Sequence, residues 1–75
     1  MDPKTTGQFI SFLRKEKGMT QKQLSEKLNL SDKAISRWET GRGFPDIESL
    51  QALSNEFYVS INELLYGKRY CVHIY

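Results

Sequence analysis

Four helix-start signals lie at short intervals along this chain of 75 residues, and their spacing limits the possible folds more than any other feature. The four polar residues that can act as N-caps are Thr20, Ser31, Asp46 and Ser60. Gln23 and Glu63 follow the first and the last of them by three residues, so both of these starts can form a capping box. Starts that recur every 11 to 15 residues leave room only for short helices, so we expect an all-α chain.

The helix stops agree with these starts. Gly18 and Gly41 can adopt the left-handed conformation that ends a helix, and Asn29 tolerates that conformation better than most other residues. Thr5 or Thr6 can cap the first helix. The predicted helices span residues 6–17, 21–28, 32–40, 47–57 and 61–66.

Each predicted helix carries a narrow hydrophobic stripe, which is typical of a helix with one buried face. The stripe residues are Phe9, Ile10, Leu13, Leu24, Leu28, Ile35, Trp38, Leu50, Leu53, Phe57, Ile61, Leu64 and Leu65. No stripe can be buried alone, so the five helices must share one core, and we expect one compact domain over residues 6–67. Residues 70–75 are rich in β-branched and aromatic types, so we expect the tail, residues 68–75, to form a short strand or a dimer contact.

The composition excludes several classes of protein. The single cysteine, Cys71, cannot form an internal disulfide, and the single histidine, His73, cannot build a multi-histidine metal site. The two could share a metal ion only across a dimer, so we expect no metal, no cofactor and a reducing, cytoplasmic location. With one histidine and one cysteine, the chain has almost no residues from which to build a catalytic nucleophile and its base, which argues against an enzyme. No hydrophobic stretch approaches the ~18 residues of a membrane span.

Only three residues, 29–31, connect the second predicted helix to the third. So short a connection forces the two helices to cross sharply, which is the helix-turn-helix arrangement. Small side chains are needed where two such helices meet, and Ser25 and Ala34 are placed to supply them. We therefore expect a helix-turn-helix at the centre of the domain.

The third predicted helix has two chemically opposite faces. With Lys33 set at 0° and a rotation of about 100° per residue, Arg37 lies near 40° and Trp38 near 140°. Ser36 and Thr40 share the side that carries the two cations. Trp38 lies on the hydrophobic side, so we expect it in the core and not as an exposed stacking platform.

Positive charge is concentrated in the first part of the chain. Residues 1–45 hold nine Lys and Arg against five Asp and Glu, a net charge of +4, whereas residues 46–75 have a net charge of −2. A basic region favours a polyanionic partner, although most cationic helix faces are simply solvated. The short turn and the small contact residues favour a third helix that is held outward to enter a DNA groove.

At these positions the sequence resembles the phage-repressor and Cro type of helix-turn-helix domain, the XRE family. The residues that carry the resemblance are Ile10, Leu13, Arg14, Gly18, Met19, Thr20, Gln21, Leu24, Leu28, Leu30, Ser31, Ala34, Ile35, Ser36, Trp38, Glu39, Gly41, Pro45, Leu50, Leu53 and those from Ser60 to Leu65. Ser25 replaces the usual Ala of the family, and Asn29 replaces the usual Gly. The resemblance covers about residues 6–67 and implies a five-helix, lambda-repressor-like fold.

The resemblance also implies roles for particular side chains. The residues that it places on DNA are Gln21, Ser31, Asp32, Lys33, Ser36, Arg37, Thr40 and Arg42. Gln21 is expected to clamp a phosphate, and Thr40 and Arg42 are expected to contact the DNA backbone. The side chains expected to meet base edges are Asp32, Lys33, Ser36 and Arg37. Arg14 and Glu39 are implied to form a partly buried ion pair that ties the first helix to the third and does not touch DNA.

Chemistry separates the roles within this set. Arg37 can donate two hydrogen bonds to O6 and N7 of one guanine, which discriminates by about 1–3 kcal/mol. Lys33 is less directional and can read guanine or neutralise a phosphate. Asp32 can accept from cytosine N4 or stabilise the helix N-terminus, and we favour the second because phosphates repel a carboxylate.

Together these features predict a sequence-specific DNA-binding transcription regulator that represses by covering its operator as a homodimer. The reading helices of a two-fold dimer lie about 34 Å apart, so the operator should be an inverted repeat. The fifth helix and the tail are the expected dimer surface, and a protein partner could bind there. Two alternatives stay open: the DNA-binding antitoxin of a toxin–antitoxin pair, and a protein-interaction module with the same fold.

Overall fold

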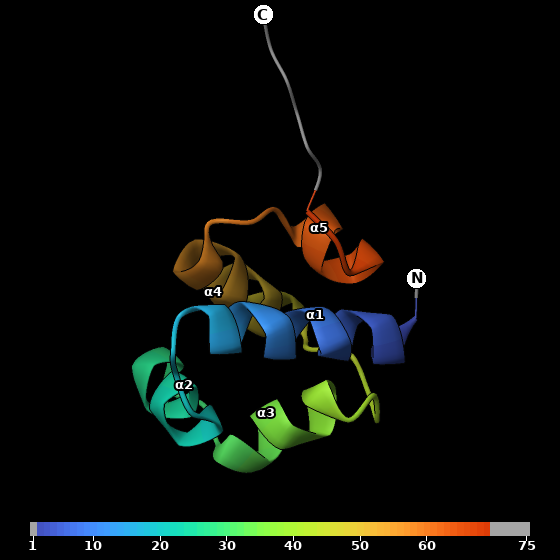
Figure 1. The fold of residues 1–75 in the computed structure, drawn as a ribbon. Helices are drawn as coiled ribbons and strands as arrows, with labels where there is room; N and C mark the ends of the chain where they lie inside the picture. Colours follow the sequence, from blue (N-terminus) through green and yellow to red (C-terminus); the bar gives the residue numbers. More distant parts are fainter. Residues whose placement is uncertain (1, 70–75) are drawn as a thin grey trace, which may run out of the picture.

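The computed structural model describes residues 2–69, and this part of the chain contains five α-helices and no strand. The helices are α1 (Pro3–Glu16), α2 (Gln21–Leu28), α3 (Asp32–Glu39), α4 (Ile47–Phe57) and α5 (Ile61–Tyr66). α1 lies between the α2–α3 pair and the α4–α5 pair and packs against both α3 and α5 (Figure 1). The expected all-α, five-helix fold is therefore confirmed.

The start of α1 corrects the sequence analysis. α1 begins at Pro3, three residues earlier than predicted, and the side chain of Asp2 caps it by accepting from the backbone N–H two residues on. Proline suits the first helical position because the N–H that it lacks has no partner there. Thr6 lies inside α1, is 1% exposed and donates to the carbonyl of Leu65 at 3.0 Å. The prediction that Thr5 or Thr6 caps this helix is therefore wrong.

The N-caps predicted for the other four helices are confirmed. Thr20 and Ser60 form capping boxes, in which the cap side chain accepts from the backbone N–H of the third helical residue. The side chain of that third residue in turn accepts from the backbone N–H of the cap. Ser31 accepts from the backbone N–H of Ala34 at 3.1 Å, and Asp46 accepts from the backbone N–H of Ser49 at 3.3 Å. The predicted bounds of these four helices agree with the structure to within one residue, because each depends on contacts only a few residues apart.

The turn between α2 and α3 has the predicted geometry. Asn29 ends α2 with φ 61° and ψ 39°, in the left-handed region. Its backbone N–H and that of Leu30 donate to carbonyls of the last turn of α2. Ser25 is 3% exposed and Ala34 is half-buried, as expected for small residues between closely packed helices. α2 and α3 therefore form a helix-turn-helix.

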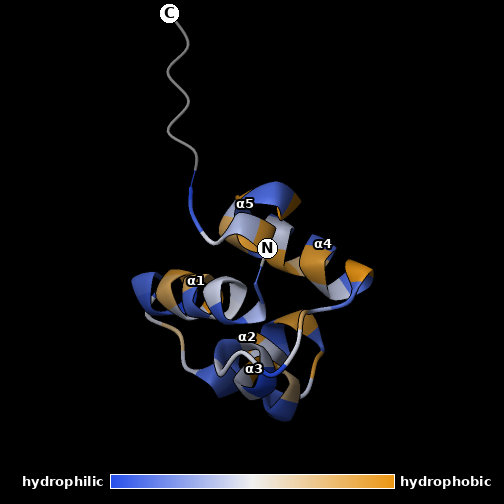
Figure 2. Ribbon diagram, turned by 90° about the vertical axis from the view of Figure 1, so that its right-hand side faces the viewer, coloured by the Kyte–Doolittle hydropathy of each residue, from blue (hydrophilic) through white to orange (hydrophobic). Residues whose placement is uncertain are grey.

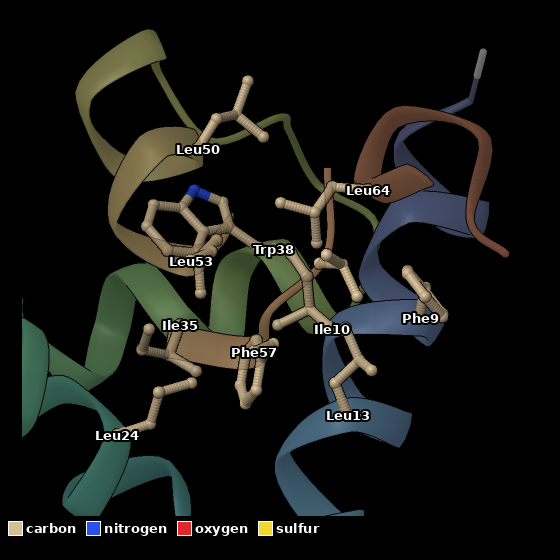
Figure 3. Packing of buried hydrophobic residues seen from close by; sticks show 11 residues of the cluster. Phe9, Ile10, Leu13, Leu24, Ile35, Trp38, Leu50, Leu53, Phe57 and Leu64 are labelled. Atoms are coloured by element: carbon tan, nitrogen blue, oxygen red, sulfur yellow. The ribbon is translucent and has the colours of Figure 1, made fainter. Parts of the chain in front are cut away.

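One hydrophobic core joins all five helices (Figure 3). Its buried members are Phe9, Ile10, Leu13, Leu24, Ile35, Trp38, Leu50, Leu53, Phe57, Val59 and Leu64. Figure 2 shows that the helices carry both hydrophobic and hydrophilic residues. Most exposed residues are polar, although Phe12, Ile47 and Tyr66 are exposed as well. Trp38 is 7% exposed and packs in this core, as predicted. Leu28, Ile61 and Leu65 are partly buried against it.

Of the predicted tail, residues 68–75, the structure describes only the first two. The guanidinium of Arg69 lies 2.6 Å from the carboxylate of Glu16 and 6.0 Å from the ring centroid of Phe12, so the chain runs along α1 as it leaves α5. The predicted strand, together with Cys71 and His73, lies outside the described residues. Among the five helices, none combines the length and the apolar character required to cross a membrane.

Candidate nucleic-acid interface

Five of the eight residues predicted to contact DNA surround one hollow on the outer side of α3. The hollow has a volume of about 500 Å³, and its lining residues are Lys33, Ser36, Arg37, Thr40 and Arg42. Ser36 is half-buried, and the other four are exposed. Three cations and two hydroxyls therefore converge on one concave surface, which is a chemistry suited to a phosphate backbone.

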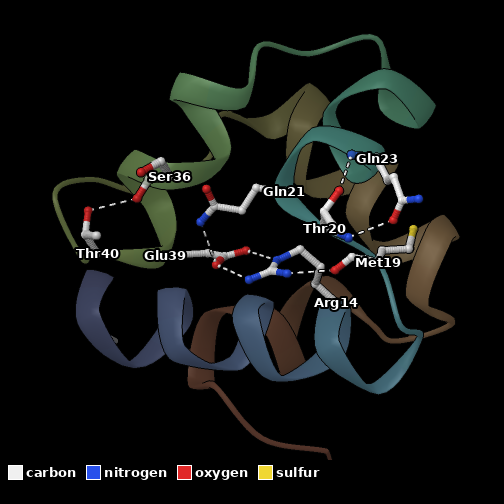
Figure 4. Close-up of polar contacts among 8 residues, drawn as sticks. All are labelled: Arg14, Met19, Thr20, Gln21, Gln23, Ser36, Glu39 and Thr40. Carbon is white, nitrogen blue, oxygen red and sulfur yellow. Dashed lines mark hydrogen bonds and ion pairs between the residues drawn. The ribbon is translucent and has the colours of Figure 1, made fainter.

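Packing on the opposite side holds this surface outward. Ile35 and Trp38 anchor α3 in the core, so the residues on the other side of the helix must face the solvent. At the C-terminal end, the hydroxyl of Thr40 lies 2.8 Å from the carbonyl oxygen of Ser36 (Figure 4). It also lies 3.1 Å from the carbonyl oxygen of Arg37. The proton of Thr40 is therefore committed to the last turn of α3.

The loop after α3 shapes the far wall of the hollow. Arg42 belongs to this loop and not to the helix, so the loop contributes a third cation to the surface. A Cβ at Gly43 would lie 3.2 Å from Nη2 of Arg37. The guanidinium of Arg37 therefore lies against the backbone of Gly43.

The three remaining predicted residues lie outside this hollow. Ser31 and Asp32 are exposed at the N-terminal end of α3, where Ser31 is the cap. The Oγ of Ser31 accepts from a backbone N–H, so its own O–H stays available as a donor. Gln21 begins α2 and is half-buried; its Nε2 donates to Oε1 of Glu39 at 3.0 Å.

Arg14 and Glu39 form an ion pair between α1 and α3, directly behind Gln21 (Figure 4). Nε of Arg14 donates to Oε2 of Glu39 at 2.7 Å, and Nη2 donates to Oε1 at 2.9 Å. Nη1 of Arg14 donates to the carbonyl of Met19 at 2.7 Å. The side chains of Arg14 and Glu39 are 11% and 6% exposed, so this pair is shielded from water and well supplied with hydrogen bonds.

Two effects oppose each other at the Glu39 carboxyl. Burial favours the neutral form, but the hydrogen bonds from Arg14 and Gln21 and the positive charge of Arg14 outweigh burial. The pKa of Glu39 therefore lies below its ordinary value.

The lowered pKa of Glu39 predicts a loss of stability in acid. A carboxyl whose pKa is lower in the folded state stabilises the fold above its unfolded pKa of about 4, and this contribution disappears as the pH falls through the folded pKa. We expect the thermal midpoint to fall between pH 6 and pH 3. The fall should be smaller when Arg14→Met and Glu39→Leu are combined, because that variant has no carboxyl at position 39. An equal fall in both proteins would contradict this source of the pH dependence.

The sequence analysis did not select two residues of α1, Gly7 and Lys4, that pack against the end of α3 and the loop after it. A Cβ at Gly7 would lie 1.9 Å from the carbonyl oxygen of Trp38, so α1 can approach the end of α3 only with glycine at this position. A glycine within a helical pattern was the available signal, because glycine weakens a helix unless the packing needs it. The exposed Lys4 lies against Gly41 in the α3–α4 loop, a contact that no local pattern announces.

The fold and this surface define a helix-turn-helix domain whose second helix of the motif, α3, presents a cationic face. The sequence profile of the Helix-turn-helix family matches residues 10–64. The chain belongs to this family, which confirms the resemblance to the phage-repressor type of domain.

Curated relatives share most of this domain with the chain. The HTH-type transcriptional activator BcrR of Enterococcus faecalis is 52% identical over 56 residues, which are 75% of this chain and 28% of BcrR. The immunity repressor protein of Bacillus phage phi105 is 34% identical over 61 residues, which are 81% of this chain and 42% of that repressor. The chain thus spans between about a quarter and a half of the length of the curated relatives that it matches.

Solved structures show the same arrangement of helices. The regulator ClgR of Corynebacterium glutamicum has a TM-score of 0.75 at 25% identity, and the match covers 87% of this chain and 69% of ClgR. PlcR of Bacillus thuringiensis, in complex with the peptide PapR7 and DNA, has a TM-score of 0.77 at 29% identity. That match covers 91% of this chain and 24% of PlcR.

Proposed function

We propose that this chain is the sequence-specific, double-stranded-DNA-binding domain of a transcription regulator, and that it acts in the cytoplasm by binding and not by catalysis. The observation that carries the proposal is the hollow on α3, where three cations and two hydroxyls meet on the side opposite the core. The relatives named as transcriptional regulators support it, as does the structure of PlcR with DNA. α3 enters the major groove with its exposed face toward the base edges.

The side chains divide between bases and phosphates. Arg37 donates to guanine once its guanidinium moves from the backbone of Gly43 into the groove. Lys33 and Ser36 meet base edges or nearby phosphates. The hydroxyl of Thr40 can donate to a phosphate only by releasing its bond within α3, so Arg42 is the stronger backbone contact of the two.

Gln21, at the start of α2, and Ser31, the N-cap of α3, contact the DNA backbone. The free O–H of Ser31 and the second N–H of Gln21 are donors for phosphate oxygens. Asp32 occupies the first position of α3, where a carboxylate stabilises the helix N-terminus. Lys4, beside the loop that carries Arg42, supplies a further cation.

Binding as a homodimer to an inverted repeat completes the proposal. Phe12 of α1 and Tyr66 of α5 are 53% and 52% exposed, and α1 packs on α5, so hydrophobic surface is available on the side away from α3. Sedimentation of the protein with and without its operator tests the dimer. If the protein stays monomeric in both conditions at high concentration, the homodimer is contradicted. A single copy would then bind the DNA.

Repression by occupancy is the proposed outcome of binding. The relatives include one protein named as an activator and one named as a repressor, so the sign of regulation needs its own test. A reporter gene whose promoter overlaps the operator should be transcribed less when the protein is present. A rise in transcription would contradict repression while leaving the proposed DNA binding intact.

Replacing Arg37 by alanine should relax the sequence preference of the protein. The loss of one bidentate contact to guanine lowers discrimination at that base pair by about 1–3 kcal/mol, or roughly 5- to 150-fold. Selection of bound duplexes from a random pool, with the wild type and the variant, measures this effect. Lys27→Ala is the matched control, because Lys27 also carries one positive charge but pairs with Glu56 of α4 at 3.1 Å.

The salt dependence of the affinity distinguishes DNA binding from protein interaction. Binding driven by phosphates should weaken steeply as salt rises, with a logarithmic slope of about −0.9 for each phosphate neutralised. Arg42→Ala, which removes the proposed phosphate contact, should reduce that slope by about 1. If no duplex from the pool binds in a salt-dependent way, the alternative of a protein-interaction module is favoured instead.

A further inference from the structure

Gln21 connects the buried ion pair to the surface that faces DNA. Its Nε2 lies 3.0 Å from Oε1 of Glu39, on the same oxygen that Nη2 of Arg14 reaches at 2.9 Å (Figure 4). The side chain of Glu39 is 6% exposed, whereas Gln21 is half-buried at the start of α2. A continuous chain of hydrogen bonds therefore runs from Arg14 in α1, through Glu39 in α3, to the half-buried Gln21 at the start of α2.

The donors and acceptors in this line determine which way the amide of Gln21 faces. An ionised carboxylate only accepts hydrogen bonds, so Glu39 can hold the NH₂ group of Gln21 but not its carbonyl oxygen. That NH₂ group has two hydrogens, and one of them forms the hydrogen bond to Glu39. Within residues 2–69 the second hydrogen has no acceptor, so it remains free to donate outward.

Arg14 makes this arrangement compatible with a nearby phosphate. A lone carboxylate behind Gln21 would repel an approaching phosphate, but two N–H groups of Arg14 neutralise Glu39 at 2.7 and 2.9 Å. Because both charged side chains are shielded from water, their geometry is held firmly.

We propose that Glu39 is a positioning residue for DNA binding: it holds Nε2 of Gln21 so that the second N–H of that amide points at a DNA phosphate. Arg14 acts through Glu39 by fixing the carboxylate and compensating its charge. This proposal rests on the proposed function and adds to it that the buried ion pair sets the affinity of an exposed contact.

A mutant cycle on operator affinity tests the proposal. The two arms are Gln21→Ala and the combined Arg14→Met and Glu39→Leu, which removes the ion pair without changing the net charge. Replacing a buried ion pair by apolar residues often preserves the fold, and circular dichroism verifies this at the temperature of the assay. A hydrogen bond to a charged group is worth enough for each arm to weaken binding about 10-fold. All changes together should weaken binding by no more than about 10-fold, because both arms remove the same contact.

A measurement on the wild type keeps the proposal testable if the combined variant does not fold. In the free protein, NMR should show one side-chain amide proton of Gln21 protected from exchange with water, and operator DNA should shift the signal of the other. Gln23 is the internal control: it lies in the same helix, but its Oε1 accepts from Thr20 and leaves both of its amide protons exposed.

The outcomes separate this proposal from the function on which it rests. Non-additive losses, or a single protected proton on Gln21, support positioning by Glu39. If the wild type binds DNA but the losses multiply to about 100-fold, or if both Gln21 protons exchange as fast as those of Gln23, Glu39 does not position Gln21 and the proposed function stands. If the wild type binds no duplex at all, both are overturned.

Discussion

Gly7→Ala is expected to lower the thermal midpoint by about 15 °C, although alanine normally strengthens a helix. The added methyl group would lie 1.9 Å from the carbonyl oxygen of Trp38, which is a backbone atom and cannot turn aside. α1 would have to move away from α3, and overpacking of this kind destabilises a domain by about 3 kcal/mol. The free energy of unfolding of a domain of this size is only several kcal/mol, so the variant should be largely unfolded near the thermal midpoint of the wild type.

Thermal unfolding by circular dichroism measures this effect, and Gly18→Ala is the matched control. A Cβ at Gly18 meets no atom within 4 Å, so its methyl group causes no clash, and only the positive φ of 70° opposes alanine there. That conformation costs a non-glycine residue about 1–2 kcal/mol. If Gly7→Ala is as stable as the wild type, α1 does not approach the end of α3 as closely as in this structure.

Arg14→Met should destabilise the domain by about 3–5 kcal/mol, because it leaves the Glu39 carboxylate buried without its cation. Urea unfolding at pH 7 measures the loss. Adding Glu39→Leu should recover much of it, since the second change removes the uncompensated charge. The expected order of stability is wild type, then the combined variant, then Arg14→Met alone.

Arg69→Met is the control for this result. Arg69 and Glu16 also form a close ion pair, at 2.6 Å, but their side chains are 47% and 45% exposed. Water and salt screen such a pair, so its loss should leave the urea midpoint nearly unchanged. If Arg14→Met destabilises no more than Arg69→Met does, burial of the Arg14–Glu39 pair has no energetic importance.

The difference between α1 and the other helices shows which boundaries a sequence can predict. Thr20 and Ser60 cap their helices through residues only three positions away, so the sequence contains the whole interaction. Thr6 looked equally suitable as a cap, but it is used inside α1 to donate to Leu65, 59 residues further along. A contact over such a distance depends on how α1 and α5 pack, and no local pattern reports it.

The candidate site divides in the same way. The face of α3 with Lys33 and Arg37 follows from helical periodicity, because Ile35 and Trp38 mark the opposite side as core. The hollow itself was not predictable, since Arg42 reaches it from the loop between α3 and α4, whose Gly41 packs against Lys4 of α1. The bond from Gln21 to Glu39, 18 residues away, likewise needs α2 and α3 to be placed first.

By itself, the sequence determined that there are five helices, the bounds of α2 to α5, the turn between α2 and α3 and the side of α3 that faces outward. Each of these depends on caps, periodicity and turn conformations that act within about one helical turn or one short connection. Only the tertiary structure decided that Gly7 must be glycine, that Lys4 lies beside the α3–α4 loop and that Glu39 holds Gln21. These are contacts between helices that packing brings together, and their geometry exists only after the hydrophobic core has formed.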